Sequence, residues 1–107
     1  MPKYLITYHG GEGMPETPEA QQEVLAAFGA WMASVGDGMV DPGAPLSVAR
    51  TVSSAGAEDG QTLAQIGGYS VIQAADLDAA QKLVESHPFI ARGGTLQVTE
   101  AIEIGGS

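Results

Sequence analysis

The stretch 67–104 constrains the fold most strongly, because its hydrophobic spacing changes from strand-like to helical and back again. It predicts, in order, a β-branched and aromatic strand over 68–74, a helix over 76–87, a break at Pro88 and Gly93-Gly94, and an alternating strand over 95–104. The hinge after the helix reads Ser86-His87-Pro88-Phe89. Pro88 disfavours helical geometry at the residue before it, so we expect the helix to end within a residue of His87.

The first half of the chain predicts a similar strand-helix unit. Residues 4–9 alternate as a short strand, with Tyr8 on one face and His9 on the other. Thr17 and Pro18 are typical of a helix start, and Gly36 suits the position that ends this helix. Six apolar residues fall on one helical stripe and are expected to face the core: Val24, Leu25, Phe28, Trp31, Met32 and Val35.

The middle of the chain predicts strands and a hairpin. Two prolines in 39–45 favour an edge strand, and 46–52 has a clearer strand pattern. Small, polar residues over 53–60 predict an exposed hairpin loop, after which 61–66 is expected to return to the sheet.

Two apolar faces are predicted in the second half. Asp76 is the expected N-cap of the second helix, which would direct these residues inward: Leu77, Ala80, Leu83, Val84 and His87. The last strand is expected to bury Leu96, Val98, Ile102 and Ile104. Glu100 shares that face, and since burying an unpaired carboxylate costs several kcal/mol, we expect a bulge or an early strand end near it.

This element order predicts one α+β domain over residues 1–107. The order is that of a βαββαβ ferredoxin-like sandwich, with an antiparallel sheet and two helices on one face. Such a sheet leaves its other face open. We therefore expect a homodimer formed through that face.

Composition limits the partners of this domain. Thirteen acidic residues against four basic ones give a net charge of −9, which opposes binding to nucleic acid and to anionic lipids. No stretch is long enough for a signal peptide or a membrane span, and there is no cysteine, so we expect a cytoplasmic protein. The glycine run 10–13 lacks the spacing of a phosphate-binding loop, and we expect no cofactor.

Four segments together resemble the YCII-related family, including its DGPF-type branch. They are 4–6, 39–46, 67–72 with 76–80, and His87-Pro88-Phe89 with 93–98. The resemblance implies a dimeric α+β barrel of ferredoxin-like protomers with a cleft between strand ends and helices. It also implies a His–Asp pair as a candidate active site, and one branch is associated with a lyase-type dehalogenation. Of the Asp-Gly-Pro-Phe motif only Asp59-Gly60 is present, and the first helix has no histidine where some members carry one.

The resemblance places the candidate catalytic residues at His87, Asp41 and His9. A histidine whose tautomer is fixed by a carboxylate could act as a general base on a small, aromatic or dienelactone-like substrate. Each residue also has a structural interpretation: a helix-end histidine caps carbonyls, and an aspartate before a proline is an ordinary turn residue. Two histidines with Asp41 could form a metal site, but no close ligand spacing supports one, so we expect none.

Two function classes follow from these residues. The first is a small-molecule enzyme or binder of lyase or isomerase type, with a ligand pocket lined by Tyr8, Trp31, Tyr69 and Phe89. The second is a non-catalytic dimeric binding or regulatory module whose functional surface is the sheet face. The sequence leaves open which one applies, and whether the protein is an enzyme. A convergence of His87 with a carboxylate in a cleft would favour the first.

Overall fold

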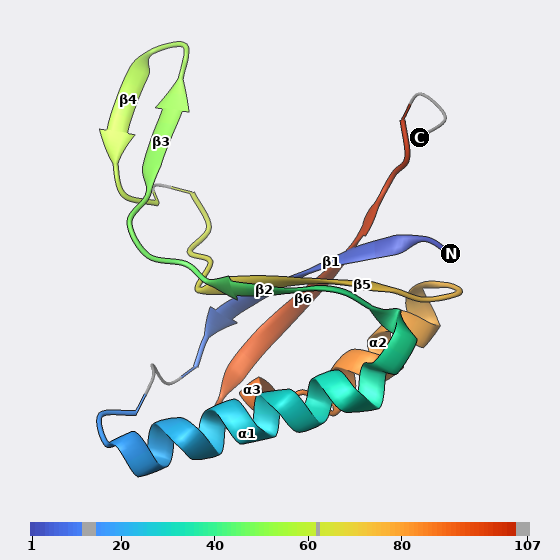
Figure 1. Cartoon of the computed structure of the whole chain (residues 1–107). Helices are drawn as coiled ribbons and strands as arrows, with labels where there is room; N and C mark the ends of the chain where they lie inside the picture. The colour runs from blue at the N-terminus through green and yellow to red at the C-terminus, as the bar shows by residue number, and fades with distance from the viewer. Residues whose placement is uncertain (12–14, 62, 105–107) are drawn as a thin grey trace.

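The elements alternate as the sequence predicts (Figure 1). The computed structural model describes residues 1–11, 15–61 and 63–104. Its elements are β1 (Lys3–Gly10), α1 (Pro18–Val35), the 3-10 turn η1 (Gly36–Gly38), β2 (Met39–Pro45), β3 (Arg50–Ser53), β4 (Gly56–Asp59), β5 (Gly68–Gln73), α2 (Leu77–Glu85), α3 (Pro88–Ala91) and β6 (Gly94–Ala101). None of the described helices is both long and apolar enough to cross a bilayer.

The main sheet has the strand order β2-β5-β1-β6, and every neighbouring pair in it is antiparallel. If the β3–β4 hairpin is set aside, this is the order of a ferredoxin-like βαββαβ sheet. The helices α1, α2 and α3 all lie on one side of it (Figure 1). The predicted α+β fold class is confirmed, and so is the prediction that β2 is an edge strand.

Local chemistry fixes where the helices begin and end. The side chain of Thr17 accepts a hydrogen bond from the N–H of Ala20, and that of Asp76 accepts one from Ala79. Gly36 ends α1 with a φ of 61°, which a residue with a Cβ rarely adopts. These three predictions are confirmed.

The core lies between the helices and the alternate residues of the sheet that face them. Its fully or nearly buried apolar members are Tyr4, Ile6, Trp31, Val35, Ile72, Ala74, Ala80 and Val84. The indole N–H of Trp31 donates a hydrogen bond of 2.8 Å to the carbonyl of Leu83, which joins α1 to α2. The helix positions are therefore held by packing and by a partly buried hydrogen bond.

Several predictions about the helix faces and the last strand were wrong. Leu25 and Leu77 are 59% and 52% exposed, because each lies at the edge of its helical stripe. No bulge removes Glu100 from β6: it pairs with Tyr4 in regular register and is exposed, and the strand ends one residue later, at Ala101. Beyond it the chain leaves the sheet, so Ile102 and Ile104 are exposed instead of buried.

The middle of the chain also differs from the prediction. Residues 46–49 are not a strand, and β3 begins only at Arg50. The predicted loop 53–60 contains the return strand β4, so the hairpin turn is shorter than expected. The described residues of 61–66 form no strand. The hairpin projects away from the main sheet on the side opposite the helices (Figure 1), and among the described residues no third strand pairs with it.

Candidate functional site

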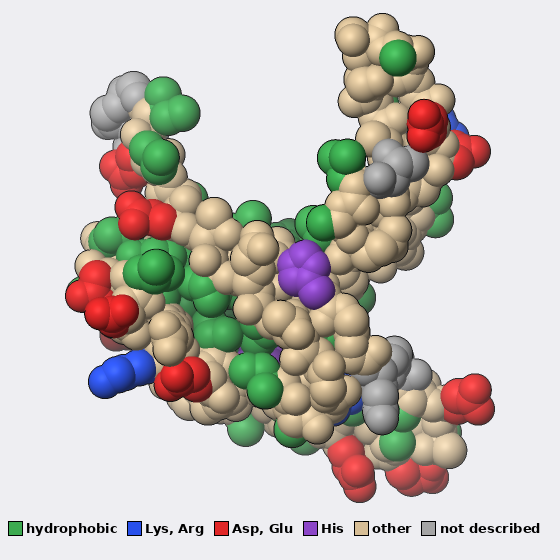
Figure 2. Space-filling view, turned by 180° about the vertical axis from the view of Figure 1, so that it is seen from behind, with side chains coloured by type: hydrophobic (Ala, Val, Ile, Leu, Met, Phe, Trp, Pro, Cys, Tyr) green, Lys and Arg blue, Asp and Glu red, His purple; other side chains and the backbone are tan. Residues whose placement is uncertain are grey.

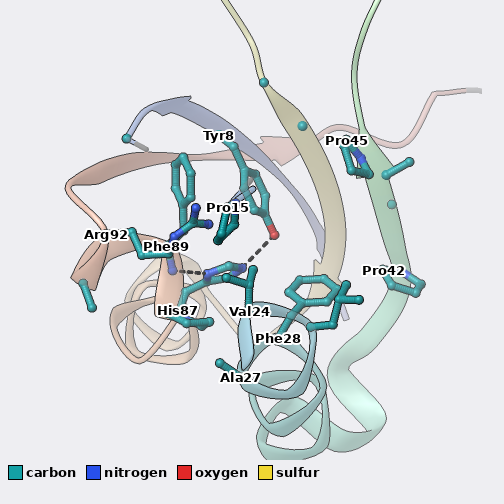
Figure 3. A pocket seen from close by; sticks show the side chains of 18 of the residues that line it. Tyr8, Pro15, Val24, Ala27, Phe28, Pro42, Pro45, His87, Phe89 and Arg92 are labelled. Carbon is teal, nitrogen blue, oxygen red and sulfur yellow. Dashed lines mark hydrogen bonds between the residues drawn. The ribbon is translucent and has the colours of Figure 1, made fainter. Parts of the chain in front are cut away.

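A cavity of about 740 Å³ opens between α1, the end of β1, the β2–β5 edge of the sheet and α3 (Figure 3). Most of its wall is apolar. Its described lining includes Tyr8, Pro15, Val24, Phe28, Pro42, Tyr69, His87, Phe89 and Arg92. A concave, largely apolar space with a few polar groups is the usual form of a small-molecule site.

His87 reaches this cavity because of Pro88. The proline ends α2 at Glu85 and leaves His87 extended, with φ −66° and ψ 131°. The chain then begins the short helix α3, and the Nδ1 atom of His87 accepts a 3.0 Å hydrogen bond from the N–H of Phe89. The expected inward direction of His87 is confirmed, since its exposed fraction is 4%. It caps the start of α3, however, and not the end of α2.

A chain of hydrogen bonds with a defined direction runs from His87 into the sheet. Since Nδ1 accepts, the neutral ring carries its proton on Nε2 and donates to the hydroxyl of Tyr8 at 2.8 Å. Ser70 donates to the carbonyl of Pro42 at 2.7 Å, so its oxygen is left to accept the Tyr8 proton at 2.8 Å. The Pro42 carbonyl can only accept a hydrogen bond. The donor and the acceptor of each hydrogen bond in this series are therefore fixed.

The electrostatics of the site favour neutral groups. Burial lowers the pKa of His87 from 6.5 to about 4, and burial raises the pKa of Tyr8 against a smaller lowering effect of the Ser70 hydrogen bond. The ring of Trp31 lies 4.3 Å from that of His87 between centroids, and Phe28 lies 5.6 Å away. At neutral pH both His87 and Tyr8 are therefore uncharged.

Two glycines leave room for the ring of Phe89 at the cavity wall. A Cβ atom at Gly94 would overlap the Phe89 ring, and one at Gly11 would lie 2.9 Å from its Cζ atom. The ring also lies 5.3 Å from that of Tyr8 between centroids. Glycine at these positions thus lets the aromatic ring lie directly on the backbone beside Tyr8.

His9 lies on the other side of the sheet from His87. Its neighbour Tyr8 faces the helices, while His9 shares the open side with Thr7, whose hydroxyl is 2.8 Å from Nε2. Its Nδ1 donates to the carbonyl of Gln65 at 2.8 Å. His9 fixes the strand end to the loop that follows the hairpin, and it is not among the residues lining the cavity.

Asp41 approaches neither histidine. It pairs with Val71, which pairs with Leu5, and His9 lies four residues further along β1. At ordinary strand dimensions this corresponds to about 13 Å along the sheet and about 10 Å across it. Asp41 is exposed, and its carboxylate accepts a 2.9 Å hydrogen bond from the N–H of Gly43. The structure therefore does not bring His9, Asp41 and His87 together.

The four predicted ligand-binding residues have different positions. Tyr8 and Phe89 line the cavity, whereas Trp31 lies behind His87 and packs against its ring. Tyr69 contributes to the lining, but it pairs with Thr7, and the alternation of β5 directs its side chain toward the open side.

Sequence reasoning missed Ser70, although one signal was present. It is a small hydroxyl residue between apolar neighbours in a buried strand, and such a residue needs a partner. It also missed the bulge near Gly43, where a Cβ would overlap the carbonyl of Tyr69. This bulge is where the Pro42 carbonyl meets Ser70. Among the described residues no group of three or more His, Cys, Asp or Glu is arranged to hold a metal ion, and residues 12 and 13 of the glycine run lie outside them.

The chain belongs to the YCII-related domain family, whose model matches residues 3–104. Comparison with solved structures finds 5-chloro-2-hydroxyhydroquinone dehydrochlorinase from Burkholderia phenoliruptrix, in complex with 2,5-dihydroxybenzoquinone. That protein is 16% identical, with a TM-score of 0.48 over 97% of this chain and 96% of its own. The comparison with curated proteins finds no match.

Proposed function

We propose that this YCII-family protein is a small-molecule enzyme of lyase or isomerase type. Its substrate would be a small, planar, largely apolar compound with at least one oxygen substituent. The observation that carries the proposal is the Tyr8–His87 hydrogen bond at the wall of an apolar cavity of about 740 Å³. The largely apolar wall of this cavity strengthens each polar contact made against it.

The direction of the hydrogen bonds gives the two residues distinct roles. Nδ1 of His87 is occupied by the N–H of Phe89 and Nε2 already carries a proton, so His87 acts as a neutral donor and not as a general base. The Tyr8 proton turns from Ser70 toward the substrate oxygen and stabilises negative charge that develops there. Loss of one such preorganised donor typically lowers the rate by about 10²–10³-fold. This assignment replaces a histidine base oriented by Asp41.

A fragment-binding experiment tests this proposal. The neutral probe 4-methylphenol, titrated into ¹⁵N-labelled protein, is expected to shift the amide of Phe89 and the Nε2 resonance of His87. Tyr8→Phe should weaken this binding, whereas Thr7→Val, on the opposite face of the same strand, should leave it unchanged. Shifts confined to the open side of the sheet would contradict the proposal.

The second candidate is a dimeric binding or regulatory module, and the exposed apolar residues favour it. Leu5 lies on the open side of the sheet and is exposed. The β3–β4 hairpin and the C-terminal segment project beside this side (Figures 1 and 2), and they and the adjoining loops expose Val48, Val52, Leu63, Ile102 and Ile104. A second copy of the chain would cover these side chains. Light scattering should give a dimer mass, and Leu5→Lys with Ile102→Lys should give a monomer.

A further inference from the structure

One short turn presents three different side chains to the cavity. Within 87–92, the N–H of Ile90 donates to the His87 carbonyl at 3.2 Å, and the N–H of Arg92 donates to the Phe89 carbonyl at 3.1 Å. His87, Phe89 and Arg92 all line the cavity, and Figure 3 shows the Arg92 side chain extending from the end of α3 toward it. Only His87 and Phe89 have a place in the function proposed above.

The charge of Arg92 is unusual for this molecule. The whole chain has four basic residues against thirteen acidic ones, yet one of the four is half-buried at the cavity wall. Of the cavity-lining residues that the structure describes, Arg92 alone carries a positive charge, and Glu23 of α1 is the acidic one. In an apolar cavity a guanidinium acts more strongly on a ligand anion than it would in water.

We propose that the cavity takes a small organic monocarboxylate with a planar apolar body. The carboxylate would bind the Arg92 guanidinium, and the body would lie against Phe28 and Phe89. A planar guanidinium matches a carboxylate with two parallel hydrogen bonds, and its five N–H groups can serve a ligand as well as neighbouring protein atoms. The inference rests on the proposed function, because it names the substrate class of the same cavity.

Two probes of the same shape and different charge test the inference. They are 4-hydroxybenzoate and 4-hydroxybenzamide, and their affinities are measured by calorimetry and by the amide shifts of Phe89. The wild-type protein should bind the benzoate about tenfold more tightly, which corresponds to about 1.4 kcal/mol. Arg92→Gln should abolish this preference and leave the affinity for the benzamide within about twofold.

A matched variant separates local recognition from total charge. Lys82→Gln removes the same charge from the exposed side of α2, away from the cavity, and should preserve the preference for the benzoate. Arg92→Lys keeps the charge but not the paired N–H donors, and it should retain part of the preference for the benzoate. If Arg92→Gln does not give a native spectrum, Arg92→Lys is used to test the inference in its place.

Equal affinity for both probes in the wild-type protein would overturn the inference while leaving the proposed function intact. A preference for the benzoate that survives Arg92→Gln, or that Lys82→Gln also removes, would overturn it as well. If neither probe binds, the inference fails. The proposed function is then judged by 4-methylphenol, which carries no carboxylate.

Discussion

The imidazole rings of the two histidines each have two described hydrogen-bond partners, on opposite sides of one sheet, but with opposite consequences. The ring of His87 accepts from a backbone N–H and donates to Tyr8, and no position remains for a second proton. The ring of His9 donates to a backbone carbonyl and meets the hydroxyl of Thr7, which can donate or accept. The Thr7 hydroxyl can therefore pair with Nε2 of His9 whether that nitrogen donates or accepts.

The difference shows that the type of partner atom decides what a buried histidine can do. A carbonyl tolerates both the neutral and the charged ring, whereas an N–H donor tolerates only the neutral one. Burial acts in the same direction at His87, whose pKa is lowered to about 4. His87 is thus a fixed donor within the cavity, and His9 is a link between a strand end and a loop.

The largest expected effect is the loss of the His87 side chain. His87→Ala would leave the Tyr8 hydroxyl and the Phe89 N–H without a partner and create a cavity beside Trp31, at a cost of about 4 kcal/mol in the free energy of unfolding. His9→Ala, at the less buried strand end, should cost about 1 kcal/mol. Urea unfolding of both variants at pH 7 measures the difference. Equal losses in the free energy of unfolding would contradict the different roles assigned to the two histidines.

The pH dependence of stability should follow His87. Its folded pKa of about 4 lies below its unfolded value of 6.5, so the unfolded state binds more protons between these limits. The contribution of neutral His87 to the free energy of unfolding is complete above pH 6.5. It is lost as the pH falls toward 4, and the total loss is about 3 kcal/mol.

Unfolding curves over this pH range should show that His87→Gln removes this part of the pH dependence, whereas His9→Gln does not remove it. The comparison is made on differences from the wild type, because the carboxylates titrate in every variant. A His87→Gln curve that runs parallel to the wild type would contradict the prediction.

A smaller effect is expected for the Tyr8 hydroxyl. Tyr8→Phe leaves Nε2–H of His87 and the Ser70 oxygen unpaired, and should cost about 1–2 kcal/mol. The ¹⁵N shifts of His87 should show a proton on Nε2 and none on Nδ1 in both proteins, because Phe89 still donates to Nδ1. A proton on Nδ1 in the wild type would show that the donor and acceptor roles assigned to His87 and Tyr8 are wrong.

The smallest expected effect is that of Asp41→Asn. The exposed Asp41 carboxylate interacts with the turn at Gly43, so its neutralisation should change stability by about 0.5 kcal/mol or less and leave the pKa of His87 where it is. An NMR titration of wild type and variant tests this. A change in the His87 pKa would restore Asp41 to the candidate site.

Much of the fold could be predicted from local signals. Thr17, Asp76 and Gly36 carry out their predicted roles because caps depend on atoms within a few residues of each other. The strand β5 was evident from its β-branched run. The hairpin was misplaced because 46–60 has weak alternation, and a strand outside the main sheet buries little that would constrain its pattern.

The candidate site could be predicted only in part. The sequence indicated His87, Phe89 and Tyr8, since the proline hinge and the strand end are visible locally. It did not separate them from His9 and Asp41, which also follow or interrupt strands. Which face of the sheet each residue occupies depends on strand register, and the bulge between Asp41 and Ala44 shifts that register.

The sequence by itself determined the types of element, their caps and the hinge that turns His87 inward, because these depend on short-range sterics and hydrogen bonds. Only the tertiary structure decided the state of the histidine. Tyr8 and His87 are 79 residues apart in the chain. Their hydrogen bond exists because β1 lies beside β6, and α2 and α3, which flank His87, pack against β6. The position of the proton on the His87 ring then follows from which atoms the fold brings together. No local sequence pattern predicts that arrangement.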